Sequence, residues 1–310
     1  MTELLTAEVI IAILTSGIRL ATPYIYAGIG EAFGQRSGVL NLGVEGQMLL
    51  GAFVSFYVVF RTENLWLGLL VAMLVGALMG LAMAYVTVNL HAQQGISGIG
   101  FYLFGLGMSE LLFKMLVGTV ETVSGFSVVH VPVLSKIPVI GEIFFQQNVL
   151  VYIAFLLVPV AWFVMNKTTL GLMIRSVGEN PEAADSVGVS VAKVRYFTII
   201  LGGTLSGVAG ASMSIALLNV FQQNMTSGLG FIAVALVYFG AWRAWGVLAG
   251  ALLFSMVQAI QLRVQIIDTI TISPDLAVMM PYILTIIVLV ASVSRVRAPA
   301  ALTKPFDRGD

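Results

Sequence analysis

Stretches of about 20 apolar residues recur along this chain of 310 residues and constrain its fold more than any other feature. A helix needs about 20 such residues to cross the hydrocarbon core of a bilayer, where every backbone polar group must be satisfied internally. We therefore predict an all-α, polytopic transmembrane helical bundle of about nine spans, within a range of about eight to ten. The expected spans are 9–30, 41–60, 65–88, 96–118, 147–166, 196–218, 227–241, 246–262 and 277–294. The span 227–241 is short enough to be a re-entrant or broken helix.

Charged residues are too scarce for a soluble surface. They make up 10% of the chain, against about 25% in soluble proteins, and the mean hydropathy is +1.00. The absence of cysteine excludes disulfides and thiol chemistry, and the two histidines, His91 and His130, are too few for a histidine-based metal site. Fifteen basic residues balance fifteen acidic ones, so no net charge attracts nucleic acid. We expect no nucleic-acid partner, no metal and no cofactor bound by this chain.

The positions of lysine and arginine predict the orientation in the membrane. With the C-terminus inside, the expected inner loops hold ten basic residues and the outer loops three, which follows the positive-inside rule. The inner set is Arg36, Lys167, Arg175, Lys193, Arg195, Arg243, Arg295, Arg297, Lys304 and Arg308, and the outer set is Arg61, Lys136 and Arg263. We predict a multi-pass protein of the cell inner (plasma) membrane with a cytoplasmic C-terminus and a periplasmic N-terminus.

Two loops are long. The predicted periplasmic loop, 119–146, contains Pro132, Pro138 and Gly141 among apolar residues, and we expect a short interfacial structure there rather than another span. The predicted cytoplasmic loop is 167–195. With these loops, residues 1–310 are expected to form a single transmembrane domain.

The cytoplasmic loop carries the signals of a very short helix at 181–187. Asn180 suits the N-cap, Pro181 the first helical position, and Glu182 the positive end of the helix dipole. Gly188 supplies a left-handed residue that can end the helix. A helix of two turns is not stable alone, so it must pack on its own domain or on a partner. An ordinary surface helix and a docking helix both fit these residues.

The same loop resembles the cytoplasmic coupling loop of permease subunits of ATP-binding-cassette importers, in the branched-chain amino acid, ribose and nucleoside permease family. The matching residues are Gly171, Arg175, Gly178, Asn180, Pro181, Ala183, Ala184, Gly188 and Val189. The segments 19–23, 36–47 and 230–236 resemble the purine-nucleoside and simple-sugar branch of that family. The chain departs from the family pattern at Tyr102, where Asn is frequent, and after Trp245, where the family has proline. Because of these departures, the resemblance does not determine which solute is transported.

The resemblance implies a transport subunit rather than an enzyme, importing a nucleoside or nucleobase, or else a simple sugar. In the family this short helix seats in a groove of the ATPase, which implies a coupling role for Arg175, Asn180, Pro181, Glu182, Ala183, Ala184 and Gly188. The implied partners are ATP-binding-cassette ATPase subunits, a second permease subunit that is a paralogue or a copy, an extracytoplasmic solute-binding protein and membrane lipid. The chain has no Walker-type phosphate-binding loop, so the partner is expected to use the ATP.

Polar residues inside the expected spans are costly and mark candidates for the solute pathway. The candidates are Asn41, Glu45, Gln47, Arg19 and Tyr102. We expect Asn41 and Glu45 on one helical face, four residues apart, and Gln47 on another. Glu45 could instead pair with Arg19 or cap a neighbouring backbone. For Arg19 we favour an ion pair with Glu31 or Glu45.

Further polar residues lie toward the outer ends of spans. Glu110 and Lys114 have the spacing of an ion pair along one helix. Gln258 and Gln261 could face solvent or the pathway, and the sequence gives no preference. An ion-coupled secondary transporter is the alternative function, with Glu45 and Glu110 as possible ligands of a coupling ion.

Overall fold

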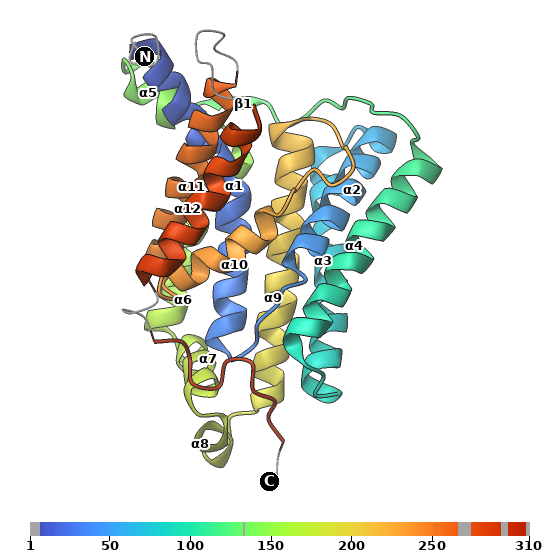
Figure 1. Cartoon of the computed structure of the whole chain (residues 1–310), viewed down its shortest axis with the longest axis vertical. Helices are drawn as coiled ribbons and strands as arrows, with labels where there is room; N and C mark the ends of the chain where they lie inside the picture. The colour runs from blue at the N-terminus through green and yellow to red at the C-terminus, as the bar shows by residue number, and fades with distance from the viewer. Residues whose placement is uncertain (1–6, 133, 266–273, 293–296, 308–310) are drawn as a thin grey trace.

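A computed structural model describes residues 7–132, 134–265, 274–292 and 297–307 (Figure 1). The helices are α1 (Ala7–Arg36), α2 (Val44–Thr62), α3 (Leu65–Ala84), α4 (Gln94–Leu116), α5 (Ile140–Phe144), α6 (Val149–Lys167), α7 (Thr169–Glu179), α8 (Pro181–Ser186), α9 (Val191–Ser212), α10 (Leu229–Phe239), α11 (Ala244–Val264) and α12 (Pro274–Ser292). Two π-helical turns, η2 (Tyr85–Asn89) and η4 (Met213–Leu217), continue α3 and α9. A short 3-10 helix, η3 (Leu134–Lys136), lies between the strands β1 (Val128–His130) and β2 (Gln146–Asn148).

The described residues contain seven helices that are long and apolar enough to cross a membrane. The all-α polytopic bundle is therefore confirmed, whereas the expected count of nine spans is not. Helix α10 has only 11 residues, which agrees with a broken or re-entrant segment at 227–241. Helix α12 covers most of the last expected span.

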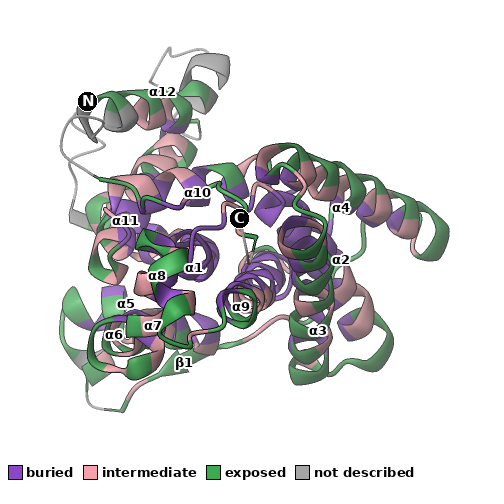
Figure 2. Ribbon diagram, turned by 90° about the horizontal axis from the view of Figure 1, so that it is seen from below, coloured by how far each residue is buried: buried purple, intermediate pink, exposed green. Residues whose placement is uncertain are grey.

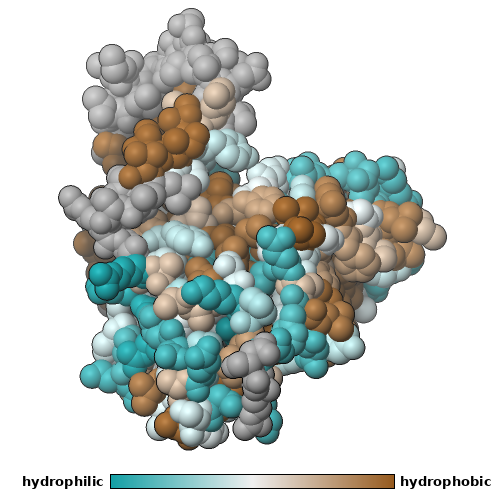
Figure 3. Space-filling view, turned by 60° about the horizontal axis from the view of Figure 1, so that its bottom comes forward, coloured by the Kyte–Doolittle hydropathy of each residue, from teal (hydrophilic) through white to brown (hydrophobic). Residues whose placement is uncertain are grey.

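The long helices run between two ends of the bundle. Figure 1 shows α8 at one end, which we call the α8 end, and α5 with β1 at the other, the α5 end. Helices α2 and α9 are central. In each of them 72% of the residues in an apolar stretch of 18 residues are buried, whereas in α4 only 22% of such a stretch is buried. Seen along the bundle, α4 forms a rim and buried residues concentrate on α1, α2 and α9 (Figure 2). Hydrophilic residues gather on the surface at the α8 end (Figure 3).

The loop between α4 and α6 forms short structure at the α5 end. Strand β1 pairs antiparallel with β2, so that Val129 faces Gln147. Ile143 of α5 packs in an apolar cluster with Ile11 and Ile18 of α1. The expectation of a short structure without a further span is confirmed for the described part of this loop.

Glycines bring the backbones of α2, α3 and α9 into direct contact. A Cβ atom added to Gly51 of α2 would lie 2.7 Å from the Cα of Gly207 on α9, and one added to Gly203 would lie 2.9 Å from the Cα of Gly80 on α3. In a bilayer such small residues drive helix packing because apolar burial between helices contributes little. By contrast, a Cβ at Gly107 on α4 would meet no atom within 4 Å.

This packing predicts a large difference between two equal substitutions. Gly51→Ala forces α2 and α9 apart and is expected to lower the free energy of unfolding by about 1–3 kcal/mol, the usual effect of overpacking. Gly107→Ala, the matched control, is expected to be neutral or slightly stabilising because alanine favours helix. Thermal unfolding of the purified variants in one detergent measures both, and equal midpoints would contradict the packing described.

Candidate functional site

Two irregular segments enter the bundle from opposite ends and meet inside it. Residues 37–43 lead from the α8 end to the start of α2, and residues 218–228 lead from the α5 end to the start of α10. Both helices begin near the middle of the long axis of the molecule (Figure 1). Interrupted helices of this kind place unpaired backbone groups at membrane depth, where they need partners.

Glu45 joins the two interrupted helices. Its Oε1 atom accepts hydrogen bonds from the Thr226 hydroxyl at 2.5 Å and the Gly228 amide at 2.7 Å. Its Oε2 atom accepts one from the Gly230 amide at 2.6 Å. The carboxylate therefore caps the N-terminus of α10, where free N–H groups and the helix dipole favour a negative charge. The expectation that Glu45 caps a neighbouring backbone is confirmed, and both of its oxygens are occupied.

Asn41 lies before α2 rather than on it, so the expected helical face shared with Glu45 is wrong. The Asn41 side-chain oxygen accepts from the Gly43 amide at 2.9 Å, which folds the chain into a turn just before the helix starts. Its amide nitrogen donates to Gln47 Oε1 at 3.1 Å, so Gln47 faces Asn41 instead of pointing elsewhere. Asn41, Glu45 and Gln47 are all buried. They hold the entry into α2.

The expected ion pair of Arg19 with Glu31 or Glu45 is also wrong. Arg19 donates from Nε to Gln147 Oε1 at 2.8 Å and from a terminal nitrogen to the Gln146 carbonyl at 3.2 Å. Glu31 lies about 18 Å further along α1, since each helical residue advances about 1.5 Å. Arg19 thus attaches α1 to the loop at the α5 end.

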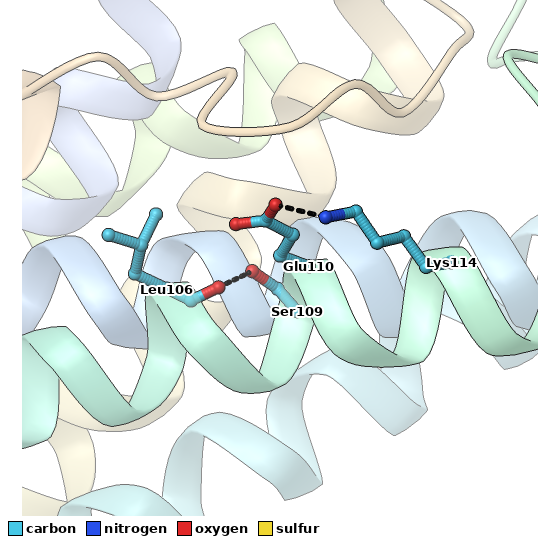
Figure 4. Close-up of polar contacts among 4 residues, drawn as sticks. All are labelled: Leu106, Ser109, Glu110 and Lys114. Carbon is cyan, nitrogen blue, oxygen red and sulfur yellow. Dashed lines mark hydrogen bonds and ion pairs between the residues drawn. The ribbon is translucent and has the colours of Figure 1, made fainter. Parts of the chain in front are cut away.

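The predicted ion pair on α4 is confirmed. Lys114 lies 2.7 Å from Glu110, both side chains are exposed, and the Ser109 hydroxyl donates to the Leu106 carbonyl beside them (Figure 4). The two carboxylates considered for a coupling ion, Glu45 and Glu110, therefore already have partners.

A cavity of about 320 Å³ lies between α1, α10, α11, α12 and η4, toward the α5 end. Its volume falls within the usual range for small-molecule sites, about 300–1,000 Å³. The lining residues are Leu20, Pro23, Tyr24, Met213, Leu217, Leu218, Met225, Thr226, Ser227, Leu229, Ile232, Gln258, Gln261, Leu262, Pro281 and Tyr282. The π-helical turn contributes Met213 and Leu217, in keeping with the frequent occurrence of such turns at functional sites.

None of the five expected pathway residues lines this cavity. Tyr102, the last of them, packs its ring edge-on against Phe231 at a centroid distance of 5.1 Å. The link to the cavity is Thr226, which is both a lining residue and a partner of Glu45. Sequence reasoning missed Tyr24 and Tyr282 and left Gln258 and Gln261 open, although two glutamines three residues apart in an apolar helix were a usable signal.

The far end of α10 is held by α1. Trp242, which follows α10, donates from its indole nitrogen to Gln35 Oε1 at 2.7 Å, and its carbonyl accepts from Arg36 Nε at 3.1 Å. Gln35 in turn donates to Glu31 at 2.9 Å, and Glu31 also accepts from the Asn41 amide at 3.0 Å. Helix α10, whose Leu229 and Ile232 line the cavity, is thus anchored at both ends.

Helix α8 forms as its capping signals predict. The Asn180 side chain accepts from the Ala183 amide at 3.0 Å, Pro181 occupies the first position, and Gly188 has a φ of 90°. The helix ends at Ser186, one residue before the expected end. Glu182, Ala183 and Gly188 are exposed while Ala184 is buried. Arg175 lies on the preceding helix α7, where it donates to the Gly171 carbonyl at 3.3 Å.

The residues around α8 touch the segment that leads into α2. A Cβ at Gly178, near the end of α7, would collide with the Arg36 carbonyl. The C-terminal segment 297–307 crosses the same region. The backbone amide of Ala301 donates to the Gly178 carbonyl at 2.9 Å, and the backbone amide of Thr303 donates to the Gly38 carbonyl at 3.1 Å. The α7–α8 region and residues 36–38 therefore pack directly together.

Comparison with known proteins identifies relatives over almost the whole chain. The model of the family described as "Branched-chain amino acid transport system / permease component" matches residues 13–289. A Haloferax volcanii protein named as a candidate glucose ABC transporter permease is 37% identical, with 96% of this chain and 97% of that protein aligned. A guanosine ABC transporter permease protein of Bacillus subtilis is 35% identical over 97% of this chain and 98% of its own length. A nucleoside ABC transporter permease protein of Lactococcus lactis is 36% identical over 91% and 92%.

Each of these three organisms also has a second related permease protein named for the same solute. These second proteins are 24–28% identical to the chain, which covers only 67–70% of their length. No solved structure matches the chain. A family match over residues 13–289, together with full-length relatives above 30% identity, establishes that the chain belongs to the branched-chain amino acid transport system permease family.

Proposed function

We propose that the chain is the translocation subunit of an ATP-driven importer for a small polar solute, a nucleoside or nucleobase in preference to a simple sugar. Members of its family are transport components and not enzymes. The observation that carries the proposal is the cavity toward the α5 end. One wall of this cavity is formed by Leu229 and Ile232 of the short helix α10, and we call this wall the cavity floor. The solutes named for its relatives, nucleosides, guanosine and glucose, support the solute class.

In this proposal the α8 end faces the cytoplasm. Among the described residues, Arg36, Lys167, Lys193 and Arg243 lie at helix ends or turns on the α8 side of their spans, which supports this orientation by the positive-inside rule. The C-terminal segment then lies inside and the start of α1 outside. The cavity, which lies toward the α5 end, would then face the periplasm, where a solute-binding protein would deliver the solute.

Helix α8 is the proposed contact with the ATPase. It is short, defined at both ends and exposed along Glu182 and Ala183, so it can enter a groove without refolding. Arg175, Asn180, Pro181, Ala184 and Gly188 would shape or support this contact. The ATPase would bind the ATP, and this chain would bind no cofactor.

Movement of α8 would reach α10 through contacts already described. The end of α7 touches the Arg36 carbonyl, Arg36 holds Trp242, and Trp242 ends the turn after α10. A displacement of α8 would thus move α10 relative to Glu45 of α2, which caps its first turn. Alternate opening of the cavity to the two sides would follow from the tilt or release of α10.

The second membrane subunit is proposed to be a paralogue. The second permease proteins in the organisms of the relatives, of which the chain covers 67–70%, support a pair of one shorter and one longer permease. The partners would then be this longer permease, two ATPase subunits, a solute-binding protein and membrane lipid.

The coupling role of α8 predicts the effect of removing its cap. Asn180→Ala loses about 1 kcal/mol of capping energy, enough to change a local equilibrium about fivefold. Because α8 is too short to persist uncapped, we expect solute-stimulated ATP hydrolysis and uptake in proteoliposomes to fall by at least that factor. Asn64→Ala is the matched control, since Asn64 caps α3 at the opposite end by accepting from Leu67 at 3.0 Å. Equal coupling in the two variants would contradict the role.

The Glu45 cap predicts a second difference. Glu45→Gln leaves one α10 amide without an acceptor, and we expect the free energy of unfolding to fall by about 1.5–3 kcal/mol, the contribution of a hydrogen bond to a charged group. ATP-driven uptake should fall with it because the cavity floor is no longer held. Glu110→Gln breaks an exposed pair that contributes about 0.3–0.5 kcal/mol and serves as the control. Thermal unfolding and uptake that are alike in both variants would contradict the assignment.

A further inference from the structure

We propose that the cavity between α1, α10, α11 and α12 is a solute-binding site of the permease itself and selects an uncharged solute with an apolar face, of the nucleoside class. This inference rests on the proposed transport function and adds a site to it. The residues that would determine specificity are Gln258 and Gln261 on α11, with Tyr24 on α1 positioning the first.

The charge of the solute follows from the lining. None of the sixteen lining residues is Asp, Glu, Lys, Arg or His. The carboxylate beside the cavity, Glu45, already accepts three hydrogen bonds from the α10 end. A phosphate or an amino-acid zwitterion would lose its water there without gaining a partner charge, which is strongly unfavourable at membrane depth. Nucleotides and amino acids are therefore excluded.

The polar contacts come from one face of α11. The Tyr24 hydroxyl donates to Gln258 Oε1 at 3.2 Å, which leaves the Gln258 amide nitrogen as a donor for a ligand. Gln261 follows three residues later and so lies on the same face. Within the described part of the chain, neither the Gln258 amide nitrogen nor the Gln261 side chain has a hydrogen-bond partner. Across the cavity, the Tyr282 hydroxyl donates to the Ser227 carbonyl at 2.9 Å.

The apolar lining distinguishes a nucleoside from a sugar. Ten of the sixteen lining residues are aliphatic, methionine or proline, including Met213, Met225 and Pro281. A hexose carries hydroxyl groups around its whole ring, and most of them would lie unpaired against such a wall. A nucleobase has apolar faces for this wall and for the aromatic rings, and it has acceptors at its edge for the glutamine amides.

Equilibrium binding to the purified full-length chain in lipid nanodiscs tests the site. The probes are guanosine, guanosine 5′-monophosphate and glucose, measured by isothermal titration calorimetry. We expect guanosine to bind at least about tenfold more tightly than either other probe, and Gln258→Ala or Gln261→Ala to weaken it about five- to tenfold, the loss of one hydrogen bond. Ile260→Ala, on the exposed side of the same helix at 39% exposure, is the matched control and should bind as the unaltered chain does.

Gln258→Met provides a second variant that keeps the approximate size of the side chain and leaves the lining uncharged. It removes the donor, so guanosine binding should weaken as in Gln258→Ala, and a thermal midpoint near that of the unaltered chain verifies folding. Guanosine affinity unchanged in all three glutamine variants, or the monophosphate or glucose bound as tightly as guanosine, would overturn the site. Either result removes this solute site, whereas the transport function has its own test and fails if the chain supports no ATP-driven uptake with its partner subunits.

Discussion

The rest of the structure depends on one buried carboxylate, Glu45, which holds the first turn of α10. A charged group at membrane depth is unfavourable unless it is fully hydrogen-bonded. Glu45 meets this condition with three donors from residues 226–230 and with the positive end of the helix dipole. The same contact satisfies backbone amides that would otherwise be unpaired. One side chain thus permits two interrupted helices to begin inside the bundle, and the cavity exists because they do.

The anchors of α10 connect the two ends of the molecule. Its first turn is held by α2 and its last by α1, through Glu45 and Trp242. The residues that hold Trp242 adjoin the α7–α8 region, where Gly178 packs on the Arg36 carbonyl. We propose that this short helix, held at both ends, is displaced as a unit when its anchors move. This arrangement supports the proposed coupling of α8 to the solute cavity.

Local features of the structure were predictable from sequence, and long-range ones were not. Asn180, Pro181 and Gly188 act within one short segment, so their spacing fixed α8 to within one residue. The Glu110–Lys114 pair lies within one helix for the same reason. The partners of Arg19 are 127 and 128 residues away and depend on where β2 packs against α1. The hydrophobic pattern of the sequence does not predict such a long-range contact. The start of α2 depended on a turn formed by Asn41, and an apolar run conceals such a break. The cavity required the relative placement of α1, α10, α11, α12 and the π-helical turn η4, and it escaped sequence reasoning for that reason.

If α10 opens the cavity alternately to the two sides, the accessibility of its cavity-lining residues must change during turnover. The chain has no cysteine, so Ile232→Cys introduces a single reactive thiol on α10. The measurement is labelling by a membrane-impermeant maleimide added to one side of proteoliposomes that contain the assembled transporter. We predict labelling from the α5 end at rest and from the α8 end only during ATP hydrolysis. Labelling from the α8 end that is independent of ATP, or absent throughout turnover, would contradict this prediction.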